Sequence, residues 1–188
     1  MLYLTYDTFF EIIADTEMNN ILKIVAILTA ILVPIAGFAT ETKLADFNGK
    51  PTSISEYAGK GKWLVVMLWA SDCQVCNKEA HQYVEFHKLH KDKDAQVLGI
   101  SLDGKEKKSD AQDFVKRHNV NFPNLIGEPI KVASMYQERT GANWIGTPSF
   151  MVFNPKGELI GAQAGAVPVS IIESFIERES TAASQSGS

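Results

Sequence analysis

Continuous apolar runs along the chain alternate with segments of helical periodicity, and the strongest run is Trp63–Trp69. A run of this length without a charge predicts a strand that is buried on both faces. Residues 74 to about 91 follow with apolar side chains at helical spacing, which predicts a helix directly after that strand. Ala95–Leu102 is the next expected buried strand, and Ser149–Phe153 is another.

The remaining predicted elements are shorter, and they complete an alternating pattern. Leu44–Pro51 is expected to be a strand that enters an Asn-Gly turn. The others are a capped single turn at Ser53–Tyr57, a helix at Asp110–His118 with Ser109 as its N-cap, a linking segment at Phe122–Leu125, a helix at Pro129–Glu138, a hairpin strand at Glu158–Ala164 and a last helix opened by Pro168. Strands that alternate with helices and end in a hairpin and a helix predict a three-layer α/β/α sandwich.

The first 39 residues predict a targeting segment rather than part of this fold. Ile24–Ala39 carries no charge, follows a short region with one base, and ends among small residues, which is typical of a signal peptide. An uncleaved membrane anchor through residues 21–39 is the alternative, although a spanning helix usually needs about 20 apolar residues. The acidic residues before Met18 are unusual for a leader, so Met18 is the expected true start.

The folded domain is expected at residues 40–180, and residues 181–188 are expected to form a disordered tail because they have no hydrophobic pattern. Residues 1–39 hold four acids and one base, so the rest of the chain carries 18 acids and 17 bases. A nearly neutral domain without a basic stripe argues against nucleic acid as a partner.

The only two cysteines, Cys73 and Cys76, lie where the central strand gives way to the following helix. Positions i and i+3 on a first helical turn bring both sulfurs to one face, where they can join in a small-ring disulfide. The positive end of the helix dipole favours the thiolate there. Two cysteines alone cannot make a tetrahedral metal site, and Asn77 stands where a c-type haem site needs histidine. The sequence therefore predicts a redox-active dithiol without metal or cofactor.

Three motifs resemble the thioredoxin superfamily: Trp-Ala-x-x-Cys-x-x-Cys at residues 69–76, Gly-Thr-Pro-Ser-Phe at residues 146–150 and Asn-Pro-Lys-Gly-Glu at residues 154–158. The leader and the Phe-Asn-Gly-Lys-Pro opening are similar to its exported TlpA-like and ResA-like disulfide reductases. The likeness covers about residues 43–178. It implies a thioredoxin-like fold with a central mixed sheet, and a periplasmic or membrane-facing oxidoreductase of the kind that serves cytochrome c or copper-site assembly.

The expected mechanism is exchange between two thiols and a protein disulfide. Cys73, the more exposed thiol, attacks the substrate disulfide, and Cys76 then attacks Cys73 to release reduced substrate. Such a cycle needs protein disulfide or dithiol substrates and a thiol protein that supplies electrons, which the resemblance suggests is membrane-bound. The same steps in reverse would oxidise a partner. A structural disulfide or two idle thiols is the plain alternative.

The resemblance also marks residues around the cysteines. It implies that the Thr147–Pro148 bond is cis and faces the cysteines, so that the Thr147 backbone can pair with an extended substrate. A trans proline at the start of the strand is the alternative. Glu79 matches an acid of ResA-like proteins and could exchange a proton with Cys76, although it could equally be a solvated surface glutamate. Trp144 is expected either to line the substrate groove or to pack in its loop.

Two further residues are expected to modulate the site. Trp69 is expected to pack beneath the active-site turn. Asp72 departs from the tryptophan that is usual before the first cysteine, and its charge should disfavour the Cys73 thiolate, in keeping with a reductase. The four histidines lack a metal-like partner set and are expected on solvated helix positions.

Three rival functions come from other classes. A thiol peroxidase shares the fold, but its pattern wants threonine where Ala70 stands. A Cu(I) metallochaperone could use both thiolates, although no third ligand is suitably spaced. A redox-inert thioredoxin-like binding module would bind its partner without Cys73.

Overall fold

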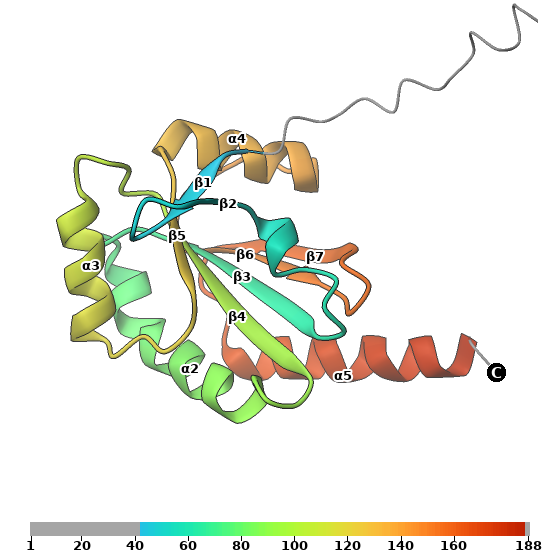
Figure 1. Cartoon of the computed structure of the whole chain (residues 1–188). Coiled ribbons are helices and arrows are strands. Elements are labelled where there is room, and N and C mark those ends of the chain that lie inside the picture. The colour runs from blue at the N-terminus through green and yellow to red at the C-terminus, as the bar shows by residue number, and fades with distance from the viewer. Residues whose placement is uncertain (1–41, 187–188) are drawn as a thin grey trace, which may run out of the picture. The chain divides into compact units, whose positions relative to one another are not determined.

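The computed structural model describes residues 42–186 (Figure 1). The predicted leader at residues 1–39 and the expected start at Met18 lie outside these residues. Within the described part, no helix is long and apolar enough to cross a membrane.

A seven-stranded mixed sheet forms the centre of the domain, in the order β2-β1-β5-β4-β3-β6-β7. The strands are β1 (Leu44–Asp46), β2 (Pro51–Thr52), β3 (Trp63–Trp69), β4 (Ala95–Ser101), β5 (Asn124–Ile126), β6 (Ser149–Phe153) and β7 (Leu159–Ala164). Strands β3, β4 and β5 run parallel, whereas β6 pairs antiparallel with β3. The fold class predicted from the sequence is therefore confirmed.

Helices cover both faces of the sheet (Figure 1). They are η1 (Ile54–Glu56), α2 (Gln74–His90), α3 (Lys108–Arg117), α4 (Pro129–Thr140) and α5 (Val169–Ser186). Alternate residues of β3 point to opposite faces, as the pleat requires. One set packs with α2, α3 and α5, and the other set packs with α4 and η1. Every residue of β3 is buried, which is why its sequence is an unbroken apolar run.

Four sequence predictions are wrong, three about elements and one about the exposure of a histidine. Asn124 and Leu125 of the expected linking segment belong to the short strand β5, which pairs with β4 and β1. The N-cap of α3 is Lys107 rather than Ser109, and no side chain caps it. His87 is buried rather than solvated, because its Nδ1 accepts a hydrogen bond from the Val97 backbone N–H.

The fourth concerns the predicted disordered tail at residues 181–188, because α5 continues through residues 181–186. Residues 187 and 188 lie outside the described part of the chain. The Trp63 indole donates a hydrogen bond to the Ser180 hydroxyl at 3.1 Å, which ties the helix to the start of β3. Beyond that point, the hydroxyls of Thr181 and Ser184 donate to carbonyls one turn earlier. Tertiary anchoring of this kind supports helix where the sequence alone has no apolar stripe.

Gly99 in β4 leaves room for the side chains of Asn124 and Trp69. We therefore expect Gly99→Ala to destabilise the domain. A Cβ atom there would overlap the Asn124 side chain and lie 2.9 Å from the Trp69 indole nitrogen. The substitution should lower the free energy of unfolding by about 1–3 kcal/mol, which urea titration measures. An unchanged midpoint would show that the neighbours shift without cost.

Candidate active site

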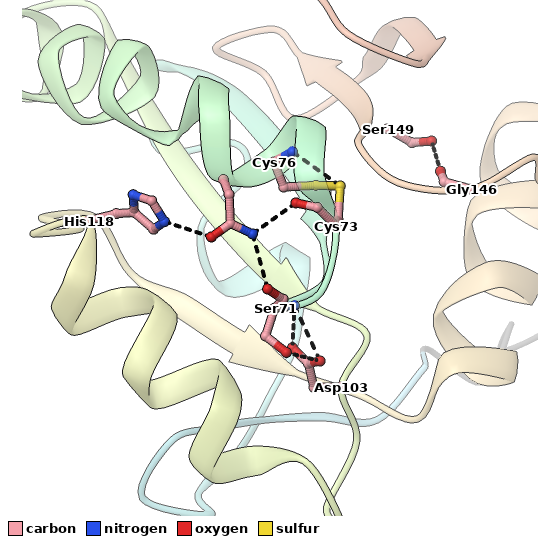
Figure 2. Close-up of a disulfide and its surroundings, with 8 residues drawn as sticks. Ser71, Cys73, Cys76, Asp103, His118, Gly146 and Ser149 are labelled. Carbon is pink, nitrogen blue, oxygen red and sulfur yellow. Dashed lines mark hydrogen bonds between the residues drawn. A yellow bond between two sulfur atoms is a disulfide. The ribbon is translucent and has the colours of Figure 1, made fainter.

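The two cysteines lie at the N-terminus of α2, immediately after β3 ends (Figure 2). Cys73 is the N-cap residue, and its Sγ accepts a hydrogen bond of 3.1 Å from the Cys76 backbone N–H. The pair forms a disulfide with the two Cα atoms 5.3 Å apart. Cys76 is completely buried and Cys73 is half-buried, so only Cys73 can meet another protein directly. The predicted exposed and deeper thiols are arranged as expected.

The Thr147–Pro148 peptide bond is cis, as the family resemblance implies. Ser149 follows it and pairs with Leu68 near the end of β3, so the start of β6 lies beside the strand that leads into the cysteine turn. Figure 2 shows Gly146 and Ser149 across from the disulfide, linked by a hydrogen bond from the Ser149 hydroxyl to the Gly146 carbonyl at 2.7 Å.

A cleft of about 430 Å³ brings several predicted residues together. Asp72, Trp144 and Thr147 all line it, together with Lys107 and the buried Asp103. Trp144 also packs edge-on against Tyr136, with ring centroids 5.5 Å apart. The two alternatives for Trp144 are thus compatible, because one ring edge can pack while another faces the cleft.

Trp69 lies beneath the turn that leads from β3 to Cys73, which we call the cysteine turn, and it is 1% exposed. Its ring stacks on Phe114 with centroids 4.2 Å apart, and its indole donates a hydrogen bond of 3.1 Å to the Asn124 side chain. Its position agrees with the expected packing role. The ring and the hydrogen bond together fix the end of β3, from which the cysteine turn departs.

Glu79 lies on the same face of α2 as Cys76, one turn further along. Its side chain is half-buried, and its Oε2 atom is buried without a hydrogen-bond partner. Burial raises the pKa of this carboxyl above its ordinary value. Burial also raises the pKa of Tyr83 on the next turn, and the nearby Glu79 charge adds to that effect. A carboxyl that is costly to ionise can hold a proton near Cys76.

Asp72 is exposed and forms an ion pair with Lys107, with 3.3 Å between the Lys107 Nζ and the Asp72 carboxylate. The charge of Asp72 could be read from the sequence, but its partner Lys107, which is 35 residues away, could not. Because both side chains face solvent, the pair is weak and screened. The lysine nevertheless offsets part of the repulsion that Asp72 exerts on a Cys73 thiolate.

We expect Asp72→Asn to shift the alkylation of Cys73 to lower pH, because removal of a nearby negative charge favours the thiolate. Lys107→Gln should shift the same curve to higher pH, since it leaves Asp72 without its partner. Iodoacetamide labelling of the reduced protein across a pH series measures both shifts. If the labelling curves of the two variants and the parent coincide, the Asp72 charge does not influence the Cys73 thiolate.

Hydrogen bonds from the side chains of Asp103 and Asn77 hold the turn before Cys73. The buried Asp103 carboxylate accepts from the Ser71 hydroxyl at 2.7 Å, from the Ser71 backbone N–H at 3.1 Å and from the Ser101 hydroxyl at 2.6 Å. The Asn77 amide donates to the backbone carbonyls of Ser71 and Cys73. Neither contact was predicted from the sequence. Asp103 gave a weak signal as an acid directly after a buried strand.

No group of three or more His, Cys, Asp or Glu side chains in the described residues could hold a metal ion. A mixed sheet between helical layers, with a disulfide at a helix N-terminus and a cis-proline beside it, defines a thioredoxin-fold thiol–disulfide oxidoreductase. The sequence pattern of the AhpC/TSA family matches residues 35–162, more than half of the chain. The chain belongs to the AhpC/TSA family.

Two kinds of known protein are among those with similar sequences. Thiol-disulfide oxidoreductase ResA of Bacillus subtilis (strain 168) is 26% identical over 133 residues, which cover 71% of this chain and 69% of ResA. Peroxiredoxin Bcp of the same organism is 26% identical over 135 residues, which cover 68% of this chain and 83% of Bcp. The ResA proteins of several other bacilli are also similar. The chain is ResA-like.

Solved structures share the fold at lower identity. A thiol:disulfide interchange protein from Chlorobium tepidum TLS superposes with a TM-score of 0.60 at 19% identity, covering 72% of this chain and 90% of that protein. A secreted Mycobacterium tuberculosis disulfide oxidoreductase gives a TM-score of 0.54 at 20% identity, covering 67% of this chain and 84% of that protein. These likenesses confirm the thioredoxin-like architecture.

Proposed function

We propose that this thiol–disulfide oxidoreductase is exported and acts as a reductase of protein disulfides through Cys73 and Cys76. The observation that carries the proposal is the unequal burial of the pair: the half-buried N-cap sulfur of Cys73 is available to another protein, and the buried sulfur of Cys76 is not. An attacking thiol must be accessible, and a resolving thiol must be close to it but shielded from competitors.

The first step is attack by the Cys73 thiolate on one sulfur of the substrate disulfide. A bond forms between that sulfur and Cys73, the substrate disulfide breaks, and the other substrate sulfur leaves as a thiolate that takes a proton. The thiolate of Cys73 is favoured by the N-terminal end of α2 and by the Cys76 backbone N–H that points at its sulfur.

In the second step, Cys76 attacks Cys73, the bond between Cys73 and the substrate breaks, and the second substrate sulfur leaves reduced. The Cys76 thiol must first lose its proton. Glu79 is proposed as the acceptor because its buried, unpartnered oxygen lies on the same helical face. The protein ends with the Cys73–Cys76 disulfide and must receive two electrons from a donor thiol protein before the next cycle.

The cleft beside the cysteines is the proposed substrate site. An extended segment of the substrate would pair with the Thr147 backbone and pass Trp144, which both line the cleft. This arrangement would hold the substrate disulfide close to the attacking sulfur of Cys73. Such orientation of the reacting atoms raises the rate of exchange. Pro148, which follows Thr147 directly, is buried.

Export is proposed from the leader-like pattern at residues 1–39, which is also compatible with a membrane tether through residues 21–39. A role in cytochrome c or copper-site assembly, with a membrane-bound electron donor, is proposed from the resemblance to TlpA-like and ResA-like proteins. One similar structure is that of a secreted disulfide oxidoreductase, which supports an extracytoplasmic site of action.

A thiol peroxidase is the second candidate, because peroxiredoxin Bcp is among the similar proteins. Ala70 stands where the peroxidase pattern wants threonine, so hydrogen-peroxide turnover is expected to be negligible beside disulfide exchange. Peroxide consumption by the reduced protein, followed directly, decides between the two. Turnover comparable to that of disulfide exchange would favour the peroxidase.

Trapping of a mixed disulfide tests the proposal. Cys76→Ser should accumulate a covalent adduct with a peptide that contains one intramolecular disulfide, because the resolving sulfur is gone. Cys73→Ser should form no adduct, since its remaining thiol is buried. Mass spectrometry under non-reducing conditions identifies the linked residue. An adduct through Cys76 in Cys73→Ser would reverse the assigned roles.

A further inference from the structure

The residue after the second cysteine, Asn77, makes hydrogen bonds that the proposed reaction has not used. Its Nδ2 donates to the Ser71 carbonyl at 3.0 Å and to the Cys73 carbonyl at 2.9 Å. The one side chain thus spans the turn that carries the attacking cysteine, from two residues before Cys73 to Cys73 itself. In Figure 2, the dashed lines that end at the carbonyl oxygens of Ser71 and Cys73 mark these bonds.

The orientation of Asn77 is set by His118, which lies just past the end of α3. Because Nδ2 donates to two carbonyls, the other amide atom of Asn77, Oδ1, is the acceptor. It lies 2.9 Å from the Nε2 atom of His118. The donor in this bond must therefore be the His118 Nε2–H. His118 follows the last residue of α3, and its half-buried ring packs on Phe114, with centroids 4.5 Å apart.

The hydrogen bond between His118 and Asn77 does not depend on the charge of His118. Burial and the neighbouring Arg117 and His81 charges lower the pKa of the His118 imidazole. The Nε2 atom carries a hydrogen in the neutral form used here and also in the imidazolium, so the bond to Asn77 exists in both. The contact is thus a fixed support rather than a pH switch.

We propose that Asn77, aimed by His118, is a positioning residue for the redox reaction that holds the Cys73 turn in its disulfide-closing geometry when the disulfide is open. This inference rests on the proposed function. In the oxidised protein the sulfur–sulfur bond itself ties residue 73 to residue 76. In the dithiol and in the mixed disulfide that tie is gone, and the Asn77 amide is one of the contacts that still restrain the turn.

A restraint that matters mainly in the open forms has two consequences. Without it, the open turn gains conformational freedom, which favours the dithiol over the disulfide. The Cys73 sulfur also spends less time within reach of Cys76, which slows the attack that resolves the mixed disulfide. Both effects concern the equilibrium and rate of exchange, rather than the stability of the oxidised fold.

Asn77→Ala is the direct test. The exchange equilibrium with glutathione is expected to move about tenfold toward the dithiol, which corresponds to a reduction potential about 30 mV higher. Resolution of a preformed mixed disulfide should slow by about tenfold, as followed by stopped-flow release of a labelled peptide thiol. Urea unfolding of the oxidised variant provides the stability readout.

His118→Phe keeps a ring against Phe114 and removes only the donor to Asn77, so the same two shifts are expected at smaller size. This variant also keeps the inference testable if Asn77→Ala does not fold. Asn121→Ala is the matched control, because the Asn121 amide likewise donates to a carbonyl of α2, that of Val84, but far along the helix from the cysteines. Its potential and resolution rate should equal those of the parent.

The outcomes separate this inference from the proposed function. If the parent protein exchanges with glutathione but both network variants match Asn121→Ala in potential and resolution rate, the inference is wrong and the proposed function stands. A loss of stability in Asn77→Ala with both redox readouts unchanged would also overturn it, since the contact would then be structural only. If the parent itself does not exchange, the proposed function fails first.

Discussion

Cys73→Ser is expected to abolish disulfide reduction, with a loss of at least roughly 10³-fold in turnover of a peptide disulfide. The reason is geometric as well as chemical. A serine hydroxyl is far less ionised than a thiol at neutral pH, and it cannot form a mixed disulfide. Cys76 cannot substitute for it, because that sulfur is completely buried. Turnover with a thiol reductant and a fluorescent disulfide peptide measures the loss.

The contrast with Cys76→Ser makes this prediction specific. That variant keeps the accessible sulfur, so it should complete the first exchange at close to the parent rate and then stop as the adduct. Equal losses of the first exchange in both variants would indicate that the turn has collapsed, and thermal unfolding of each variant checks for this. Substantial turnover by Cys73→Ser would contradict the assigned order of attack.

Glu79→Gln is the second large effect that we expect, with resolution of the mixed disulfide slowed by roughly 10²-fold. Removal of a positioned proton acceptor typically costs a factor of this order or more, and glutamine preserves the shape of the side chain. Glu85→Gln is the matched control, since Glu85 lies on the same helix but is exposed and paired with Lys88 at 3.5 Å. It should resolve at the parent rate.

Glu79 should also leave a signature in the pH dependence of stability. Its pKa in the folded protein is raised by burial, so above the ordinary value of 4.5 the folded state binds more protons at this site than the unfolded state. The free energy of unfolding therefore falls as pH rises from that value through the raised pKa. Glu79→Gln should abolish this decline, whereas Glu85→Gln should retain it. Identical pH–stability profiles for all three proteins would contradict a buried, unpartnered carboxyl.

The parts of the site that could be predicted from sequence are those set by neighbours along the chain. The unbroken apolar run of β3 and the two cysteines three residues apart predict a buried strand, a turn and a helix with both sulfurs on one face. The same local geometry places Glu79 one turn beyond Cys76. The cis bond before Pro148 came from the family resemblance, because composition and spacing carry no signal for it.

The missed contacts join residues that are far apart in the sequence. The Asn77–His118 bond spans 41 residues, and the bonds between Ser71 and Asp103 span 32. Polar residues in loops and at helix ends have no periodicity that would pair them, so only the assembled sheet reveals the partner. The same reason explains strand β5, whose three residues are too few to show alternation and pair only through long-range contacts.

Titration of the purified protein against a glutathione redox series is the most direct test of whether the Cys73–Cys76 pair carries the function. Acid quenching, thiol labelling and mass measurement give the fractions of dithiol and disulfide at each ratio. We expect one reversible two-electron transition that is confined to this pair, and no transition in Cys73→Ser. A folded protein that stays in one form across the whole series would contradict the account.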